Sequence, residues 1–130
     1  MSKSPWPNFS YDELRCRCGR CSSDGTEMDP AFMDQVQKLR ILFGKPLTIN
    51  SPYRCPKHPV EAKKAKPGVH AEGKAIDIAC TGADAVELLR LAMTLPFTGV
   101  GIQQRGTGRY IHLDMAAAQA GRPRPTLWSY

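Results

Sequence analysis

Residues 68–79 read GVHAEGKAIDIA, and the last five of them, AIDIA, are predicted to form a β-strand. Short apolar runs with β-branched residues are typical of strands, and alternate side chains of a strand point to opposite faces. Ile76 and Ile78 are therefore expected to enter the core, while Asp77 lies on the opposite face between two alanines. That face has room for an ion and a substrate beside the carboxylate.

The later stretch RYIHLDM, residues 109–115, is predicted to form another strand of the same kind. The apolar side chains expected to enter the core are Ile111, Leu113 and Met115. The opposite face then carries Tyr110, His112 and Asp114. A histidine and a carboxylate therefore share one surface of the sheet.

His70 precedes Asp77 by seven residues and lies between glycines, which permit close approach of the backbone. It can fold back over the strand that carries Asp77. Together with His112 these residues would bind zinc through three protein ligands and leave a fourth position for water, which is the pattern of catalytic zinc sites. A single histidine is more often a surface or core residue, so the spacing alone does not decide between these interpretations.

Two amphipathic helices are expected to cover the core face of the sheet. Asp29 and the proline that follows it are typical of a helix N-terminus, and apolar residues then recur at helical spacing until Gly44. A second helix is predicted to begin at Thr81, where Asp84 completes a capping pattern, and to end near Pro96.

A short third helix is predicted where Ser10 and Glu13 form a capping box. Further strands are predicted at residues 47–50 and 99–104, and the glycines of Arg105–Gly108 suit a hairpin turn before the strand that carries His112. These elements indicate an α+β fold in which two to three helices pack on a small, mostly antiparallel sheet. The candidate site lies on the exposed face of that sheet.

The chain has 130 residues, which is enough for one hydrophobic core but not comfortably for two, so a single domain over residues 1–130 is expected. Residues 9–26 form its cysteine-containing N-terminal segment. Residues 56–68 show no regular period and are expected to form a long functional loop. Residues 116–130 are expected to form an irregular C-terminal tail whose aromatic side chains anchor it to the body.

Five cysteines cannot all pair within one chain. Four of them could supply thiolates to a tetrahedral structural zinc ion, namely Cys16, Cys18, Cys21 and Cys55. The first spacing, C-x-C, is tighter than the usual C-x-x-C, and free thiols or one or two disulfides are the alternatives. Cys80 ends an apolar run and is expected to be a small core residue.

The net charge of +6 favours anionic partners such as an anionic cell envelope. Nucleic acid is not expected as a partner, because the chain lacks a basic stripe with interleaved aromatic residues. Four lysines cluster in the predicted loop and are expected to be exposed: Lys57, Lys63, Lys64 and Lys66. Neither a signal-peptide run nor a membrane span is evident, so synthesis in the cytoplasm is expected.

Three segments together resemble the signature set of a known family: SPYRCP at residues 51–56, H-x-x-G-x-A-x-D at residues 70–77, and IHLD at residues 111–114. The chain resembles the D-alanyl-D-alanine carboxypeptidase and L-alanyl-D-glutamate endopeptidase family of zinc peptidases, which shares its fold with the hedgehog amino-terminal domain. The resemblance covers about residues 9–130. It implies one catalytic Zn²⁺ ion, with the ligands His70, Asp77 and His112.

The resemblance also implies a zinc metallopeptidase of D,D-carboxypeptidase or L,D-endopeptidase type that hydrolyses peptide bonds involving D-amino acids in the peptidoglycan stem. Arg54, in SPYR, matches the arginine that steers the carbonyl or carboxylate group of the substrate. Its guanidinium suits that role because it presents a fixed, always-charged fork. A surface ion pair is the alternative role for Arg54.

The chain departs from the family pattern at the general base. Many members carry an acidic residue three positions before the last zinc histidine, and here that position is Arg109. Asp114 is the best substitute, either as a proton carrier or as a group that orients His112, and Glu72 is a weaker candidate. His58 lies between two prolines in an expected exposed turn, either near the substrate or without a role.

A phage setting is expected for such an enzyme, either as an endolysin released through a holin or as a virion-associated protein that acts at the bacterial cell wall. A monomer is the default. The alternative function is a zinc-stabilised module that binds the cell wall without cutting it, which the missing upstream acid keeps open.

Overall fold

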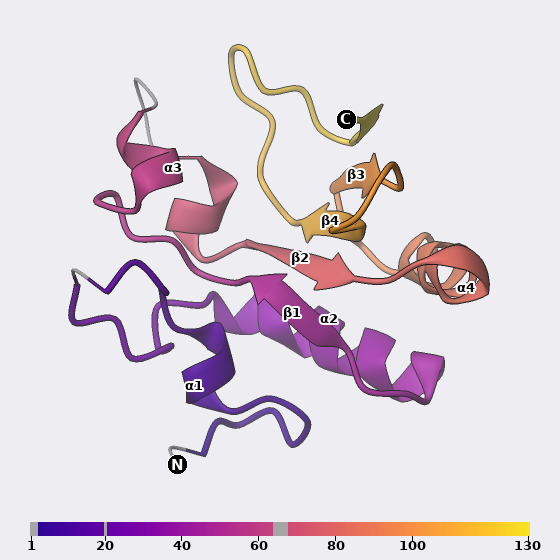
Figure 1. The fold of residues 1–130 in the computed structure, drawn as a ribbon, viewed down its shortest axis with the longest axis horizontal. Helices are drawn as coiled ribbons and strands as arrows, with labels where there is room; N and C mark the ends of the chain where they lie inside the picture. The colour runs from indigo at the N-terminus through magenta and orange to yellow at the C-terminus, as the bar shows by residue number, and fades with distance from the viewer. Residues whose placement is uncertain (1–2, 20, 64–67) are drawn as a thin grey trace.

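The computed structural model describes residues 3–19, 21–63 and 68–130. Its helical segments are α1 (Tyr11–Leu14), α2 (Pro30–Phe43), α3 (Pro59–Ala62), the 3-10 segment η1 (Val69–Glu72) and α4 (Gly82–Ala92), shown in Figure 1. Its strands are β1 (Thr48–Ser51), β2 (Ala75–Ala79), β3 (Gly99–Gln103), β4 (Tyr110–Asp114) and β5 (Thr126–Ser129). Across the described ranges, no helix combines the length and apolar character needed to cross a membrane.

Within the described residues the strands form one sheet in the order β1-β2-β4-β3-β5. The pairs β1–β2, β2–β4 and β3–β4 are antiparallel, and β3–β5 is parallel. The predicted α+β fold with a mostly antiparallel sheet is therefore confirmed. The strand predicted at residues 47–50 is found one residue later, and the hairpin turn at Arg105–Gly108 connects β3 to β4 as predicted.

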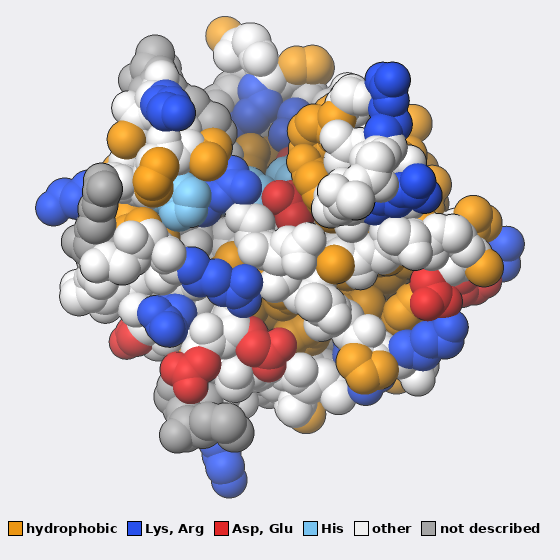
Figure 2. All heavy atoms as spheres, in the orientation of Figure 1, with side chains coloured by type: hydrophobic (Ala, Val, Ile, Leu, Met, Phe, Trp, Pro, Cys, Tyr) orange, Lys and Arg blue, Asp and Glu red, His pale blue; other side chains and the backbone are white. Residues whose placement is uncertain are grey.

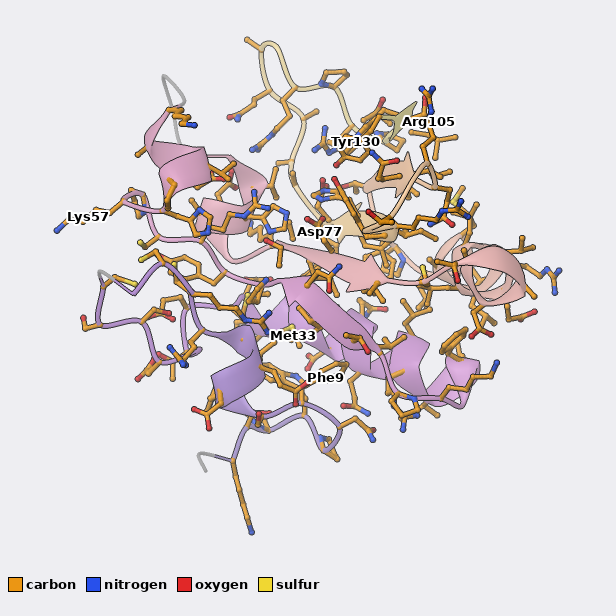
Figure 3. The ribbon with its side chains drawn as sticks, viewed as in Figure 1. Phe9, Met33, Lys57, Asp77, Arg105 and Tyr130 are labelled. Atoms are coloured by element: carbon orange, nitrogen blue, oxygen red, sulfur yellow. The ribbon has the colours of Figure 1, made fainter. Side chains whose placement is uncertain are left out.

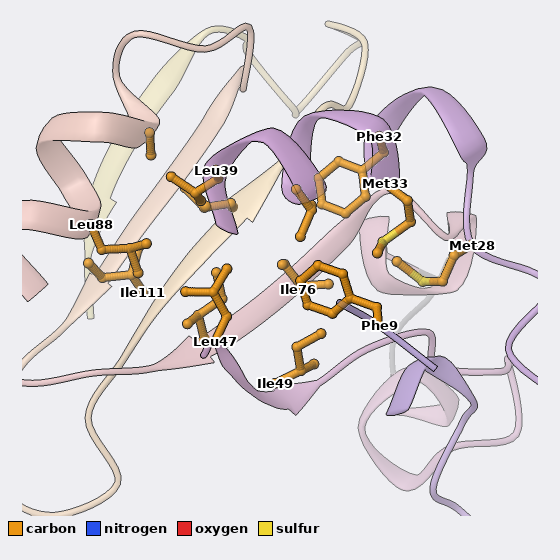
Figure 4. Packing of buried hydrophobic residues seen from close by; sticks show 14 of the residues in the cluster. Phe9, Met28, Phe32, Met33, Leu39, Leu47, Ile49, Ile76, Leu88 and Ile111 are labelled. Atoms are coloured by element: carbon orange, nitrogen blue, oxygen red, sulfur yellow. The ribbon is translucent and has the colours of Figure 1, made fainter. Parts of the chain in front are cut away.

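The core lies between the sheet and the helices α2 and α4 (Figure 4). Phe32 and Leu39 from α2 and Leu88 from α4 pack with Ile76 from β2 and Ile111 from β4, and all five are almost fully buried. Burial of apolar side chains is the main force that holds such layers together. The alternation of faces predicted for β2 and β4 is thus confirmed, and it leaves their intervening side chains on the other face.

Helices α1 and α2 begin as their capping residues predict. The Ser10 hydroxyl accepts a hydrogen bond from the Glu13 amide, and the Glu13 carboxylate accepts one from the Ser10 amide, at 3.0 Å. Asp29 accepts from the Phe32 amide at 2.9 Å, which satisfies a free N–H of the first turn of α2. Gly44 ends α2 in the left-handed conformation, with φ 74°.

The prediction for α4 needs two corrections. Thr81 occupies the N-cap position, but its side chain makes no capping hydrogen bond, and Asp84 pairs instead with the Lys45 ammonium group at 2.6 Å. The helix ends at Ala92 rather than near Pro96. The residue before a proline avoids the helical conformation, so the chain leaves the helix through turns before it reaches Pro96.

The prediction of a loop over residues 56–68 is wrong for Pro59–Ala62, which form the helix α3. His58 caps the short helix α3, and its Nδ1 atom accepts a hydrogen bond from the Val60 amide at 3.2 Å. The proline at the first helical position favours this start. Lys57 and Lys63 are exposed as predicted, whereas the other two lysines of the predicted cluster, Lys64 and Lys66, lie outside the described residues.

The prediction of an irregular tail at residues 116–130 is wrong for its last part. Residues Thr126–Ser129 form β5, which adds to the sheet beside β3. The Thr126 amide donates to the Thr98 carbonyl at 2.8 Å, and the Tyr130 amide donates to the Ile102 carbonyl at 3.2 Å. The tail therefore completes one edge of the sheet and is held close to the face that carries the candidate site.

Gly73, the glycine of the H-x-x-G motif, allows the short segment η1 to pack against the chain before α2. It adopts a left-handed conformation with φ 73°, and a Cβ atom there would lie 2.2 Å from the Glu27 carbonyl oxygen. The Asp29 amide donates to the Gly73 carbonyl at 2.8 Å. Only glycine fits this combination of conformation and contact, so the motif fixes where His70 enters the site.

Candidate metal centre

The three predicted ligands come from different elements and meet on the face of the sheet opposite the core. His70 lies in η1, Asp77 at the centre of β2, and His112 at the centre of β4. Asp77 and His112 are direct neighbours in the antiparallel register. In Figure 3, Asp77 lies on the opposite side of β2 from Met33 and Phe9, which belong to the core.

The donor atoms of these residues converge closely. The Asp77 Oδ1 atom is 3.0 Å from His112 Nδ1 and 3.4 Å from His70 Nε2, and the three donor atoms all lie within 4.8 Å of one another. All three side chains are buried to the same degree, with 6% of each residue exposed. The structure therefore brings together the residues that the sequence singled out, in an arrangement that could hold a metal ion.

In each imidazole the ring nitrogen that faces away from Asp77, here called the outer nitrogen, lies beside a hydrogen-bond acceptor. That contact fixes the orientation of the ring. His70 Nδ1 lies 2.9 Å from the carbonyl oxygen of Pro52, and His112 Nε2 lies 2.7 Å from Asp114 Oδ2. These oxygens only accept, so a neutral ring that donates to them carries its proton on the outer nitrogen. The lone pairs of His70 Nε2 and His112 Nδ1 in the neutral rings therefore face the Asp77 carboxylate.

Two lone pairs and an anion repel one another unless a cation or a proton lies between them. Imidazole nitrogens whose other N–H donates to a carbonyl or a carboxylate are the usual ligands of zinc. The donor set thus fits a zinc ion with His70, Asp77 and His112 as ligands and a fourth position open toward the pocket.

Electrostatics in the absence of metal agree with this geometry. Burial by itself would lower the pKa of His112, but its hydrogen bonds with Asp114 and Asp77 outweigh burial and raise that pKa. Burial by itself would raise the pKa of Asp77, but hydrogen bonds from His112 and His70 hold it well below its ordinary value. The site thus keeps its carboxylate ionised and attracts positive charge, whether a proton or a metal ion.

Asp114 lies behind His112 rather than in the pocket. It is fully buried, with 0% of the residue exposed, and Arg124 binds it with two hydrogen bonds, Nε to Oδ1 at 3.0 Å and Nη2 to Oδ2 at 2.8 Å. The Ala116 amide also donates to Oδ1, at 3.2 Å. Burial would raise the pKa of Asp114, but its bonds with His112 and Arg124 lower it strongly. Of its two predicted roles, this position fits the orientation of His112.

Arg54 extends from the loop after β1 to the edge of the site. Its Nε atom donates to the Ser51 hydroxyl at 2.9 Å, its Nη1 atom is 3.2 Å from Glu61 Oε2, and its Nη2 atom is 3.6 Å from Asp77 Oδ2. The Arg54 amide donates to the His70 carbonyl at 3.1 Å. These partners are part-buried or buried, so the alternative of a surface ion pair does not describe the residue.

Glu61 is a site residue that the sequence did not reveal. It lies in α3, is 1% exposed, and bonds both to Arg54 and to the Gly68 amide, whose nitrogen is 2.6 Å from Oε1. A carboxylate buried with an arginine holds that arginine in place. The sequence pattern predicted a loop here instead of α3, so this contact was not expected.

A pocket of ≈ 440 Å³ opens above the three candidate ligands. Its volume lies within the range of small-molecule sites. Besides these ligands and Arg54, it is lined by Arg124 and by the aromatic residues Tyr110, Trp128 and Tyr130. Figure 2 looks onto this face, where pale-blue histidine atoms lie in a hollow with basic side chains around it.

Aromatic rings from β4, from β5 and from Tyr130, the residue after β5, form one wall of the pocket. The centre of the Trp128 ring lies 5.1 Å from the centre of the His112 ring and 6.4 Å from that of the Tyr130 ring. The ring centres of Tyr130 and Tyr110 lie 5.4 Å apart. The Arg124 guanidinium lies over the Trp128 ring, 5.3 Å from its centre. The tail aromatics, expected only to anchor the tail, thus face the candidate metal ligands.

Two further candidates lie away from the ligands. Glu72 pairs with Arg122, with an N–O distance of 2.5 Å, and His58 caps α3. Neither is among the described residues that line the pocket.

The cysteines predicted to form a second cluster do meet: Cys16, Cys18, Cys21 and Cys55. Cys80 is half-buried and packs against the core, and burial raises the pKa of its thiol to about 11.

Gly99 of β3 leaves space for the Asp114 carboxylate, and filling that space should destabilise the fold. A Cβ atom on Gly99 would lie 2.3 Å from both oxygens of Asp114, which Arg124 and His112 hold in place. We expect Gly99→Ala to lower the free energy of unfolding by about 1–3 kcal/mol, measured by urea denaturation. Ser129→Ala, at an exposed position of β5, is the control and should change it by less than about 0.5 kcal/mol. Equal stability of Gly99→Ala and the parent chain would contradict this packing.

Comparison with known proteins places this geometry in a family context. The sequence profile of a family described as Peptidase M15 matches residues 7–114. The match therefore runs from before α1 to the end of β4 and includes the three candidate ligands, Arg54 and Asp114, whereas β5 lies beyond it. Among curated proteins, no sequence matches the chain at a significant level.

Proposed function

Because the chain belongs to the M15 family of zinc metallopeptidases, we propose that it hydrolyses a peptide bond involving a D-amino acid in the stem peptide of bacterial peptidoglycan. The observation that carries this proposal is the convergence of His70 Nε2, Asp77 Oδ1 and His112 Nδ1 at the base of a pocket. The open side of this donor set faces the space where a peptide would bind. A structural zinc site would instead be closed by a fourth protein ligand.

Zinc bound to these residues would supply an acidified water molecule and a Lewis acid for the scissile carbonyl. Arg54 places a fixed positive charge at the edge of the same pocket, where it can bind a carbonyl oxygen or a carboxylate of the substrate. Glu61 and Ser51 hold the guanidinium in position by binding Nη1 and Nε. The pocket therefore combines a metal site with a preorganised anion-binding group.

In this proposal Asp114 orients His112 and does not carry the proton. Its oxygens accept from Arg124, His112 and the Ala116 amide, and none of the residue is exposed to the pocket. Asp114 thereby keeps His112 Nε2 protonated and directs the Nδ1 lone pair toward Asp77. Such supporting partners typically change metal affinity or activity by about 10- to 100-fold.

Tyr110, Trp128 and Tyr130 are proposed to bind the substrate peptide along one wall of the pocket. Aromatic rings supply a large contact area at low entropic cost. Trp128 and Tyr130 lie beyond the residues that match the family profile, so the choice of substrate would depend on a part of the chain outside that match. A phage lytic or virion-associated role at the cell wall is the proposed setting, supported by a net charge of +6 that favours an anionic envelope.

Removal of the metal should abolish activity. Purified chain incubated with peptidoglycan should release free amino groups, and prior removal of zinc with a chelator should stop this release until zinc is added back. Lys38→Ala, which changes an exposed residue of α2 outside the pocket, should retain the activity. Mass spectrometry of the products of a defined stem peptide then distinguishes carboxypeptidase from endopeptidase cleavage.

Two outcomes of this experiment would contradict the proposal. Release that persists in zinc-free protein would exclude a zinc peptidase. Sedimentation with peptidoglycan without any release of amino groups would favour the alternative function, a zinc-stabilised module that binds the cell wall.

A further inference from the structure

A second group of potential metal ligands lies in the N-terminal half of the molecule. The four sulfur atoms of Cys16, Cys18, Cys21 and Cys55 all lie within 4.8 Å of one another. Cys18 Sγ is 3.6 Å from Cys21 Sγ and 3.4 Å from Cys55 Sγ. Zinc–sulfur bonds of about 2.3 Å in a tetrahedron place the sulfurs about 3.8 Å apart, whereas a disulfide bond is about 2.05 Å long. The spacing therefore suits a shared metal ion better than a disulfide.

The surrounding backbone supports such a cluster. Cys16 and Cys55 are buried, and the Cys55 amide lies 3.2 Å from Cys16 Sγ, so it donates to the sulfur. The Cys16 amide donates a hydrogen bond to the Ser23 hydroxyl oxygen at 3.0 Å. Amide donation to sulfur stabilises a thiolate, which is the form that binds metal. Cys18 and Cys21 have the C-x-x-C spacing that is typical of structural zinc sites.

We propose that Cys16, Cys18, Cys21 and Cys55 bind a structural zinc ion, separate from the ion in the pocket. Four thiolates close the coordination sphere, so this ion has no position for a water molecule or a substrate. It would join the N-terminal segment to a residue that lies 37 positions from Cys18 in the chain. Such a crosslink stabilises the folded chain, because a preformed site is absent from the unfolded state.

The location of this cluster connects it with the pocket. Cys55 directly follows Arg54, whose amide donates to the His70 carbonyl at 3.1 Å. The structural ion would therefore hold the chain segment from which Arg54 reaches the site. This proposal does not depend on peptidase activity, and its test uses metal content and spectroscopy.

Metal analysis of the purified full chain should find about two zinc ions per chain. His112→Ala should leave about one, and the double variant Cys18→Ser, Cys21→Ser should also leave about one. Cys80→Ser changes a cysteine outside the cluster and should leave the metal content unchanged. After exchange of zinc for cobalt(II), the wild-type chain and His112→Ala should both show the intense sulfur-to-cobalt charge-transfer absorption of a tetrathiolate site.

The cobalt spectrum keeps the test decisive even if the cysteine variants fail to fold. Absence of thiolate charge transfer in the cobalt-loaded wild-type chain would overturn the proposal. So would a disulfide among these four cysteines, detected by mass spectrometry of the non-reduced protein. Loss of activity with a retained thiolate spectrum would instead count against the proposed peptidase function alone.

Discussion

Replacement of Asp77 by asparagine should lower kcat/KM for peptidoglycan hydrolysis by about 1000-fold or more and remove the zinc ion from the pocket. The Asp77 carboxylate supplies the only negative charge among the three candidate ligands, and it contacts His112 at 3.0 Å and His70 at 3.4 Å. Asparagine has nearly the same shape but lacks the charge, so the fold should persist, as measured by circular dichroism. Activity and zinc content are to be measured on the same preparation.

Asp84→Asn is the matched control, because Asp84 pairs with Lys45 on the exposed surface of α4. It should retain full activity and the same zinc content as the parent chain. An Asp77→Asn protein that keeps both its pocket zinc and more than about a tenth of its activity would rule out Asp77 as a ligand.

Replacement of Arg54 by lysine should lower kcat/KM by about 100-fold while the zinc content stays unchanged. The guanidinium binds Ser51 through Nε, Glu61 through Nη1 and approaches Asp77 through Nη2. An ammonium group keeps the charge but cannot make these contacts at once, so the positive charge is no longer held at a fixed point of the pocket. Comparing Arg54→Lys with the parent chain therefore separates the effect of the guanidinium geometry from the effect of its positive charge.

Arg90→Lys is the control for this change, since Arg90 pairs with Glu87 on an exposed helix face. It should behave as the parent chain does. Full activity of Arg54→Lys would show that the fork geometry is not needed, and loss of zinc in Arg54→Lys would show that the residue acts through the metal site instead.

Much of the candidate site follows from local patterns in the sequence. The alternation of apolar and polar residues in β2 and β4 is enough to place Asp77 and His112 on the face opposite the core, because a strand has a strict period of two. The glycine and alanine positions of the H-x-x-G-x-A-x-D string then allow His70 to approach. What this local pattern could not supply is the register, Asp77 beside His112, which depends on the pairing of two distant strands.

The contacts that the sequence did not reveal are those made between distant segments. Strand β5 forms because the edge of β3 offers free hydrogen-bonding groups, not because its own residues alternate clearly. Arg124 lies two residues before this strand and binds Asp114 from the tail, 10 positions away in the chain. Glu61 is buried against Arg54 and the Gly68 amide, and the sequence of its segment shows no helical period. Helix α3 did carry a local signal, the proline after His58.

His70 Nε2, Asp77 and His112 Nδ1 are proposed to bind one zinc ion. This ion can be located by anomalous diffraction from a crystal of the zinc-loaded chain, recorded on both sides of the zinc absorption edge. We expect an anomalous peak about 2.0–2.2 Å from these three donors, with His112 bound through Nδ1 while its Nε2 atom stays with Asp114. A zinc-loaded, active crystal without a peak among these atoms would rule out this ligand set, and coordination of His112 through Nε2 would rule out the orienting role of Asp114.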